Sequence, residues 1–254
     1  MLKTRVIPTM LWKGVGLVKG VGFNSWRRVG PVLPAVKVYN QRDVDELVLV
    51  DISATNESRR FETEALEIFA SEVSVPFACG GGVRTVEDAR DLLAKGADKV
   101  IINSEAYRNP TLVSSIAETF GVQCVTISVD YRVVDGIPCC FSHSGLSDER
   151  VNVVEWVRRM VDHGAGEVLL TSIERDGTMS GYDLQTLECV TSSVNVPVIA
   201  SGGAGTYEDL LLAIVEAGAS AAAAASIFHF TEMTPREAKR YLRERGVQVR
   251  NDLT

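Results

Sequence analysis

Eight short apolar runs alternate with amphipathic stretches along the chain, and this alternation constrains the fold more strongly than any other feature. Seven of the runs are rich in β-branched residues and almost continuously apolar, as is typical of parallel strands covered on both faces. The eighth run consists of alanines, and only its place in the series makes it a strand. The runs cover residues 5–11, 46–52, 75–80, 99–104, 124–130, 167–173, 196–201 and 221–226.

Helical patterns occupy the intervals between these runs. One pattern follows Thr85, has acidic residues in its first turn and stops at Gly96, and a second repeats this arrangement after Thr206. A third begins near Pro235. Such caps and stops are the usual boundaries of helices. Eight strand–helix units without a low-complexity linker predict an α/β fold, a single (β/α)8 TIM barrel over residues 1–254.

The sequence also repeats itself internally. The matched segments share a Val-Pro pair, a glycine pair and a Glu-Asp pair after threonine, which the general similarity of strand–helix units does not explain. We therefore expect two half-barrels of four units each, about 1–120 and 121–254. The matches are 75–104 with 196–226, where the second copy has one extra residue, and 45–52 with 166–173.

Composition narrows the partners that such a chain can have. Its 254 residues carry a formal net charge of -7, so nucleic acid and anionic membrane are not expected partners. There is no signal-peptide pattern and no apolar run of about 18 residues, which predicts a cytoplasmic protein. The five cysteines lack CxxC spacing and the three histidines lack ligand spacing. We expect neither a disulfide framework, nor a bound metal, nor a cofactor.

Glycine-rich strand ends occur at equivalent places in the two predicted halves. Glycine allows backbone N–H groups to approach an anion, and a following helix N-terminus adds its positive dipole end. We expect an elongated ligand with a phosphate or similar anion at each end, although simple turns are the alternative for either site alone. The glycines are Gly80, Gly81 and Gly82 in the first half and Gly202, Gly203 and Gly205 in the second, and the next strands end in Asn103-Ser104 and Ala225-Ser226.

Carboxylates follow two strands on the same face of the predicted barrel. Asp130 ends the fifth run, and Asp176 with Gly177 lies just past the sixth. A carboxylate at the top of a barrel strand is a candidate for substrate contact or acid–base chemistry, while an Asp-Gly turn is the alternative at 176–177. The first run instead ends in Leu11, before a glycine-rich loop. A hairpin around Asp135-Gly136 could act as a lid.

Four ionisable residues open strands rather than end them. In-register parallel strands would place them in one ring at the bottom of the barrel, where two cations and two anions can neutralise each other. Such a ring would plug or gate the bottom, although solvated surface charge is the alternative for any one member. The four are Arg5, Glu46, Lys99 and Glu167.

With these features, the chain resembles the HisF family, the cyclase subunit of imidazole glycerol phosphate synthase. The similarity runs over almost the whole chain and includes "DELVLVDI", "CGGGVRTVEDA", "GADKVIINS", "LLTSIERDGTMSGYD" and "VIASGGAG". It implies a barrel of the ribulose-phosphate-binding type with a phosphorylated small-molecule ligand at its top. It also implies a HisH-type glutaminase on the bottom, whose ammonia crosses the barrel.

The resemblance further implies roles for individual residues. The bottom ring matches the family's ammonia gate, Asp98 a partner contact, Lys19 the substrate loop, and Asp130 one of two aspartates that transfer protons. The phosphate contacts of the family match Gly82, Asn103, Ser104, Gly177, Gly203, Ala225 and Ser226.

The departure from the family pattern lies at Leu11, where the family has its other aspartate. Leucine cannot transfer a proton, and loss of such a group typically costs about 10²–10⁴-fold in rate. The first strand instead resembles HisF-like paralogues associated with amidation of surface-polysaccharide (lipopolysaccharide) sugars. We therefore expect a subunit that delivers ammonia to a sugar amidotransferase. A histidine-pathway cyclase that tolerates Leu11 is the main alternative, and another phosphate-binding barrel, such as an aminoaldose isomerase, is the third.

Overall fold

The computed structural model describes residues 3–14 and 16–250 and contains a closed parallel barrel. Eight strands pair in the cyclic order β10-β11-β12-β1-β4-β5-β6-β7, and a pairing of β7 with β10 closes the ring. The predicted TIM barrel is confirmed, including the alanine run as a strand. The strands are β1 (Arg5–Lys13), β4 (Leu47–Asp51), β5 (Phe77–Gly80), β6 (Lys99–Ile102), β7 (Val125–Val134), β10 (Glu167–Ser172), β11 (Val198–Ser201) and β12 (Ala221–Ala224).

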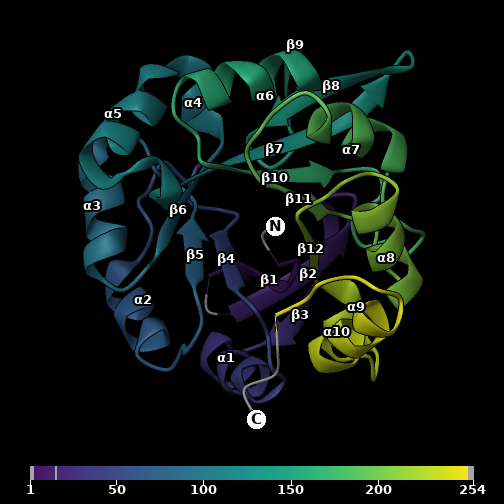
Figure 1. Cartoon of the computed structure of the whole chain (residues 1–254). Helices are drawn as coiled ribbons and strands as arrows, with labels where there is room; N and C mark the ends of the chain where they lie inside the picture. The colour runs from purple at the N-terminus through teal and green to yellow at the C-terminus, as the bar shows by residue number, and fades with distance from the viewer. Residues whose placement is uncertain (1–2, 15, 251–254) are drawn as a thin grey trace.

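Helices surround the strands, as Figure 1 shows in a view along the barrel. They cover the outer faces of the strands, which explains why the strand sequences are apolar on both sides. The helices are α1 (Val32–Gln41), α2 (Thr63–Ala70), α3 (Val86–Ala94), α4 (Ser104–Arg108), α5 (Thr111–Phe120), α6 (Val153–Asp162), α7 (Leu184–Thr191), α8 (Tyr207–Val215), α9 (Ser226–Phe230) and α10 (Pro235–Glu244), with a short 3₁₀ helix, η1 (Val122–Cys124).

Local sequence signals fix several helix boundaries. Thr85 accepts a hydrogen bond from the Asp88 backbone N–H and completes a capping box at the start of α3. Thr206 and Asp209 form the same capping box at the start of α8. Each box satisfies backbone donors that the first helical turn leaves unpaired. The division of the chain into two half-repeats stays a prediction.

The barrel interior is packed rather than open along most of its length. Side chains alternate along each strand, so every second residue points inward. On β1 the inward residues are Arg5 at the bottom, then Ile7 in the apolar middle, then Thr9 and Leu11 at the top. The middle layer consists of Ile7, Val48, Ala78, Ile101, Leu169, Ile199, Ala221 and Ala223.

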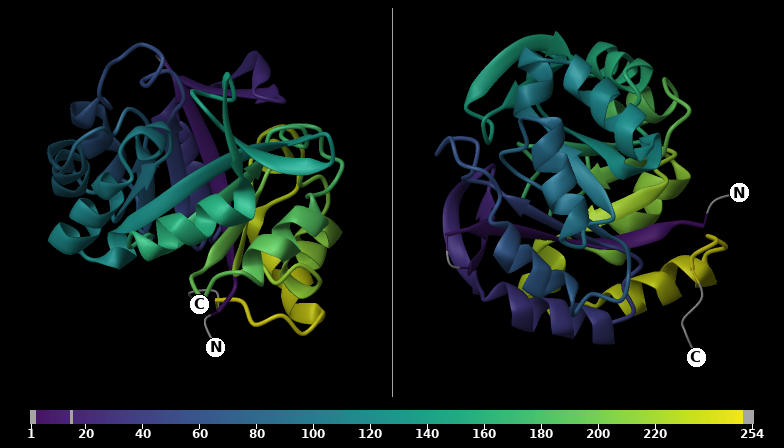
Figure 2. Two further views of the ribbon diagram at one scale, coloured as in Figure 1. Left: turned by 90° about the horizontal axis from the view of Figure 1, so that it is seen from above. Right: turned by 90° about the vertical axis from the view of Figure 1, so that its left-hand side faces the viewer.

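The segment after β1 corrects one expectation. The glycine-rich stretch is not a loop but forms β2 (Gly16–Val21), which pairs antiparallel with β1, and β3 (Asn24–Gly30). Glycine permits the close approach of strands here, because a Cβ on Gly20 would lie 2.0 Å from the Asn24 carbonyl oxygen. Figure 2 shows this purple hairpin at the end of the barrel opposite the start of β1.

A second excursion follows β7, as the sequence predicted. β7 continues beyond the barrel and turns back at Asp135 and Gly136, whose φ angles are 50° and 78°. The return strand β8 (Ile137–Ser142) then pairs with β9 (Ser147–Asn152). The top of the barrel is therefore flanked by two antiparallel excursions, one from β1 and one from β7.

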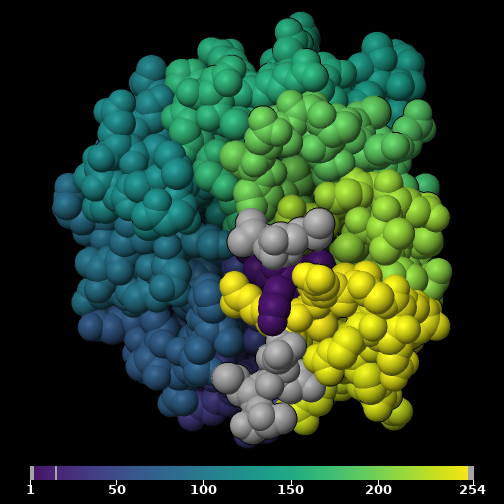
Figure 3. All heavy atoms as spheres, viewed as in Figure 1, coloured from purple at the N-terminus to yellow at the C-terminus, as the bar shows by residue number. Residues whose placement is uncertain are grey.

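The C-terminal segment is bound to the bottom of the barrel. The Thr4 N–H donates to the Gln248 carbonyl at 2.8 Å, and an Arg250 guanidinium nitrogen donates to the Asp45 carbonyl at 3.2 Å. Figure 3 shows the yellow C-terminal residues beside the start of the chain on this face. Across residues 3–14 and 16–250, no helix has both the length and the apolarity that a membrane crossing requires.

Candidate functional site

One cavity of about 250 Å³ opens among the carboxyl ends of the barrel strands. Most predicted residues of the top face line this cavity, although they come from segments far apart in the sequence. Of the predicted strand-end glycines, Gly81 and Gly202 also line it, whereas Gly80 and Gly205 do not. The other lining residues that were predicted are Lys19, Gly82, Asn103, Ser104, Asp130, Asp176, Gly177, Gly203, Ala225 and Ser226.

Two similar cradles stand in the wall of the cavity. Gly82 follows β5 with φ 71°, and Gly203 follows β11 with φ 119°. A Cβ at Gly82 would lie 2.4 Å from the Arg59 carbonyl oxygen, and one at Gly203 would lie 2.2 Å from the Gly181 carbonyl oxygen. Only glycine fits either place, because both the backbone angle and the lack of space exclude a side chain. Among the described residues, neither glycine N–H has a hydrogen-bond acceptor.

The helices next to the cradles repeat the same geometry. Asn103 precedes α4 with φ -133° and ψ -92°, and Ala225 precedes α9 with φ -126° and ψ -67°. Ser104 and Ser226 are the first residues of these helices, so their backbone N–H groups have no partner within the helix. Each cradle thus presents backbone donors to the cavity, an arrangement suited to anion binding.

Asp130 lies at the top of β7 and is 9 % exposed. Burial, together with the nearby charge of Asp176, raises its pKa to about 7, against the opposing effect of a hydrogen bond from Asn103. That bond joins Asn103 Nδ2 to Asp130 Oδ2 at 2.7 Å. A carboxyl group that titrates near neutral pH can both give and take a proton, which is the property that acid–base catalysis requires.

Asp176 and Lys19 form an ion pair that joins the β2–β3 hairpin to the loop after β10. Lys19 Nζ lies 2.5 Å from Asp176 Oδ2, and the Gly22 N–H donates to the Asp176 carbonyl at 2.8 Å. Burial raises the pKa of Asp176, and the Lys19 charge opposes that shift. Lys19 and Asp176, which were predicted separately for the site, therefore form one ion pair, and this ion pair holds the β2–β3 hairpin over the cavity.

Leu11 also lines the cavity and faces Asp130 across the barrel. β1 and β7 are four strands apart in a ring of eight, so the ends of the two strands lie on opposite sides. Leu11 pairs with Val50 on β4 and Val18 on β2. One wall of the cavity therefore carries a carboxyl group and the opposite wall carries an aliphatic side chain.

Several cavity residues were missed by the sequence reasoning. Asp51 ends β4, and its carboxylate is 2.5 Å from an Arg59 guanidinium nitrogen. Its position at a strand end was a signal that could have identified it.

Two buried polar atoms of the cavity wall, Thr9 Oγ1 and Asn103 Oδ1, have no hydrogen-bond partner within the described part of the chain. Buried polar atoms are normally paired, so these two are candidate ligand contacts. His143 and Trp26 reach the cavity from the two antiparallel excursions.

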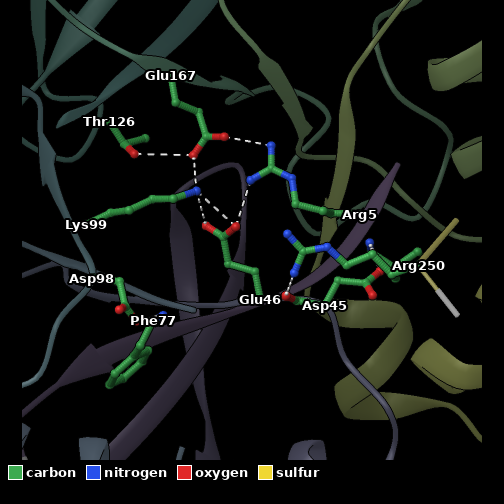
Figure 4. Close-up of polar contacts among 10 residues, drawn as sticks. Arg5, Asp45, Glu46, Phe77, Asp98, Lys99, Thr126, Glu167 and Arg250 are labelled. Carbon is green, nitrogen blue, oxygen red and sulfur yellow. Dashed lines mark hydrogen bonds and ion pairs between the residues drawn. The ribbon is translucent and has the colours of Figure 1, made fainter. Parts of the chain in front are cut away.

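At the bottom of the barrel the four predicted charges form one closed ring, drawn in Figure 4. Arg5 contacts Glu46 at 2.7 Å and Glu167 at 2.6 Å. Lys99 contacts Glu46 at 2.9 Å and Glu167 at 2.7 Å. Burial opposes ionisation of Glu167, but the charges of Arg5 and Lys99 outweigh it and lower the pKa of this carboxyl. Each charge meets two opposite charges, which compensates the cost of burial.

Asp98 lies beside the ring on the bottom face and is exposed. One of its carboxylate oxygens accepts a hydrogen bond from the Phe77 N–H at 2.8 Å, as Figure 4 also shows. The other oxygen forms no hydrogen bond to a residue in 3–14 or 16–250. Asp98 thus presents a fixed negative charge on the surface that surrounds the ring.

Comparison with known proteins decides the family. A family model described as a histidine biosynthesis protein matches residues 5–234. The subunit HisF of imidazole glycerol phosphate synthase from Chlorobaculum parvum is 45% identical over 250 residues, which cover 98% of this chain and 100% of the relative. The chain belongs to the HisF family. The proteins of the same name from Chlorobium luteolum and Prosthecochloris aestuarii are 44% and 45% identical over the same share of each chain.

These relatives confirm the family and leave one finer expectation without support. All three carry the name of imidazole glycerol phosphate synthase, and none is named for the modification of a polysaccharide sugar. The family match therefore favours the cyclase reading over the polysaccharide branch that the first strand resembles. The substitution at Leu11 remains as a property of this chain.

Proposed function

We propose that this chain is the cyclase subunit of an imidazole glycerol phosphate synthase, which takes ammonia from a glutaminase partner and combines it with a phosphorylated ribotide. The observation that carries the proposal is that two features, a ring of charges and an anion-binding cavity, lie at opposite ends of one barrel. A closed ring of four buried charges lies at the bottom, and a cavity with two anion cradles and a neutralisable carboxyl lies at the top. The names of the HisF relatives support the same reading.

The top cavity fits a substrate with an anionic group at each end. The cradles at Gly82 and Gly203 follow β5 and β11, which are four strands apart in the ring of eight, and Asp130 is on the wall between β6 and β10. A ligand that spans both cradles therefore passes Asp130. In the proposed reaction Asp130 transfers a proton to or from this ligand, and Lys19 with Asp176 keeps the hairpin in place over it.

The bottom face fits a partner that supplies ammonia. Ammonia released into bulk water at neutral pH becomes ammonium, so delivery through the barrel protects the nucleophile. In this proposal the ring of Arg5, Glu46, Lys99 and Glu167 controls entry, and Asp98 contacts the glutaminase.

The test compares two nitrogen donors. With its glutaminase partner and glutamine, Lys99→Ala should lose most product formation while glutamine hydrolysis continues. With ammonium chloride at high concentration the same variant should retain the rate of the wild type. Lys95→Ala is the matched control, because Lys95 forms its ion pair with the exposed Glu67, away from the ring.

Unfolding measurements must accompany this test, because removal of one ring member leaves buried charge unpaired. Asp98→Ala should weaken the complex, with Asp91→Ala as the control on the neighbouring helix. If Lys99→Ala is folded and forms product from glutamine as fast as the wild type does, the gating role of the ring is wrong.

One specific observation favours a second candidate function. Leu11 occupies the position from which the family's other aspartate would face Asp130. A barrel that only delivered ammonia to a separate sugar amidotransferase would not need that carboxylate. Turnover of the ribotide with ammonium chloride separates the two functions, because a delivery subunit would give none.

A further inference from the structure

Three side chains of the β7–β9 excursion form a hydrogen-bonded series that the proposed function does not use. The Ser142 hydroxyl donates to a carboxylate oxygen of Glu149. Ser142 Oγ also lies 2.7 Å from His143 Nδ1. Ser142 is completely buried, so water does not compete for these bonds.

The series fixes the tautomer of His143. A hydroxyl has one proton to donate, and a carboxylate only accepts. Because Ser142 gives its proton to Glu149, it must accept from His143 Nδ1–H. Nε2 then carries the free lone pair, and it forms no hydrogen bond within residues 3–14 and 16–250. His143 is therefore held as a base, with its orienting groups on the other ring nitrogen.

The backbone places His143 at the edge of the top cavity. Its N–H donates to Ser104 Oγ at 3.1 Å, next to the first anion cradle. The turn that carries it has three successive positive φ angles, 52° at His143, 59° at Ser144 and 78° at Gly145. Ser144 Oγ anchors this turn by donating to the Ile52 carbonyl at 2.8 Å. Such an unusual turn, tied at both sides, holds the imidazole in a defined place.

Apart from Asp130, the acidic residues that line the cavity form ion pairs with lysine or arginine side chains. Asp51 pairs with Arg59 at 2.5 Å, and Asp176 pairs with Lys19 at the same distance. Glu105 lies 3.5 Å from Arg108. Among the described acids and histidines that line the cavity, Asp130 and His143 are the two without a cationic partner. They are thus the groups best able to exchange protons with a ligand.

We propose that His143 is a second proton-transfer group of this site, which works with Asp130 and takes over the part that the family assigns to a carboxylate at position 11. This inference rests on the proposed cyclase function. It explains how the site can keep two proton-transfer groups although Leu11 is inert. Glu149 and Ser142 are positioning residues that act through the ring.

The proton balance has two stages. In the first, the ammonia lone pair forms a C–N bond to a substrate carbonyl carbon while the C=O π bond breaks, and its electron pair goes to oxygen. The Asp130 carboxyl gives that oxygen a proton, and His143 Nε2 takes a proton from the nitrogen, so a neutral carbinolamine results. In the second, the roles reverse. The His143 imidazolium gives its proton to the hydroxyl as the C–O bond breaks and water leaves, and the Asp130 carboxylate takes a second proton from nitrogen, which restores both groups. Between the stages the Glu149 carboxylate stabilises the imidazolium through Ser142.

The kinetic test uses the full chain, the ribotide substrate and ammonium chloride. His143→Gln should lower kcat by about 10²-fold and change KM by less than about threefold. Glu149→Gln and Ser142→Ala should lower kcat by less than His143→Gln does, with KM again nearly unchanged, because both residues act through the ring. Asp148→Asn, an exposed acid on the same strand, should leave the rate unchanged.

A coupling test with position 11 is sharper. If Asp at position 11 and His143 serve the same step, His143→Gln in a Leu11→Asp background should cost less than about tenfold, against about 10²-fold in the wild type. Equal costs in both backgrounds would mean that His143 acts elsewhere, and the proposal would be wrong. A purely structural role would lower both rates alike.

One readout does not depend on activity. Nitrogen NMR of histidine-labelled chain should show His143 as the Nδ1–H tautomer in the wild type and a mixture in Ser142→Ala. An Nε2–H tautomer in the wild type overturns the proposal. A wild type that shows no turnover while Leu11→Asp does refutes the cyclase function itself and the proposal with it. A wild-type turnover that His143→Gln does not change refutes this proposal alone.

Discussion

The two ends of the barrel handle charge in opposite ways. At the bottom, two cations and two anions contact each other in a closed ring with distances of 2.6 to 2.9 Å. At the top, Asp130 has an amide as its hydrogen-bond partner and faces Leu11 across the cavity. Burial is similar in the two places, since Glu167 is 5 % exposed and Asp130 is 9 % exposed.

Burial therefore does not decide the charge state by itself. The pKa of Glu167 is lowered because two cations outweigh its burial, whereas the pKa of Asp130 is raised to about 7 because no cation does. The pairing at the bottom favours the ionised form of Glu167, whereas the top favours a carboxyl group that can change its protonation state near neutral pH. Paired charge suits a gate, and an unpaired carboxyl suits proton transfer.

The largest expected effect comes from removing the unpaired carboxyl. Asp130→Asn keeps the shape and the contact with Asn103 but cannot transfer a proton at neutral pH. The rate with ammonium chloride should fall by about 10²–10⁴-fold. Steady-state turnover measures this, with Asp148→Asn as a control. A loss below about threefold would mean that Asp130 does not take part in proton transfer.

The ring is broken most simply by Glu46→Gln. This change leaves Arg5 and Lys99 with one carboxylate between them, and removal of a buried partner typically costs about 3–5 kcal/mol of unfolding free energy. Chemical denaturation measures it. Glu87→Gln removes an exposed ion pair to Arg90 and should cost less than about 1 kcal/mol. Equal losses in the two variants would contradict the account of the ring as a buried, mutually compensating set.

The raised pKa of Asp130 also predicts a dependence of stability on pH. An acid with a raised folded-state pKa stabilises the fold most when both states are protonated, and this stability is lost as pH rises toward about 7. From pH 5 to pH 8 the wild type should therefore lose about 2 kcal/mol relative to Asp130→Asn. Urea unfolding of both proteins at the two pH values tests this. A difference that does not change with pH would place the titration of Asp130 near its ordinary value.

The smallest effect should follow the loss of a neutral neighbour of the ring. Thr126 Oγ1 lies 3.4 Å from Glu167 Oε2, near the limit of a hydrogen bond. Because the two cations already hold Glu167, Thr126→Val should cost only about 0.5–1 kcal/mol and leave glutamine coupling intact. Thermal unfolding and the glutamine-dependent rate measure this. A loss as large as that of Glu46→Gln would show that the ring depends on its neutral partner.

The sequence predicted the barrel, the ring and the top cavity because each depends on a periodic or repeated signal. Parallel strands in register begin in the same layer, so Arg5, Glu46, Lys99 and Glu167, which open their strands, could be placed in one layer from the sequence. The β2 strand was missed because its glycines resembled a loop, although Gly20 is required there for close strand pairing.

The His143 series could not be foreseen for a different reason. Ser142 and Glu149 meet only because β8 and β9 pair with an irregular register between Cys139 and Phe141. No spacing in the sequence specifies that shift. Asp51 was a different kind of miss, since it ends β4 and lies one residue before the end of the predicted run 46–52.

The central claim is that the top of this barrel still performs proton transfer although Leu11 faces Asp130. The most direct measurement is the turnover of the ribotide by wild-type chain with ammonium chloride, beside that of Leu11→Asp. The account predicts a wild-type rate that Asp130→Asn lowers by about 10²–10⁴-fold and that Leu11→Asp raises by no more than about tenfold, well below the gain expected from restoring a missing acid–base group. No turnover in the wild type together with clear turnover in Leu11→Asp would contradict it and favour a subunit that only delivers ammonia.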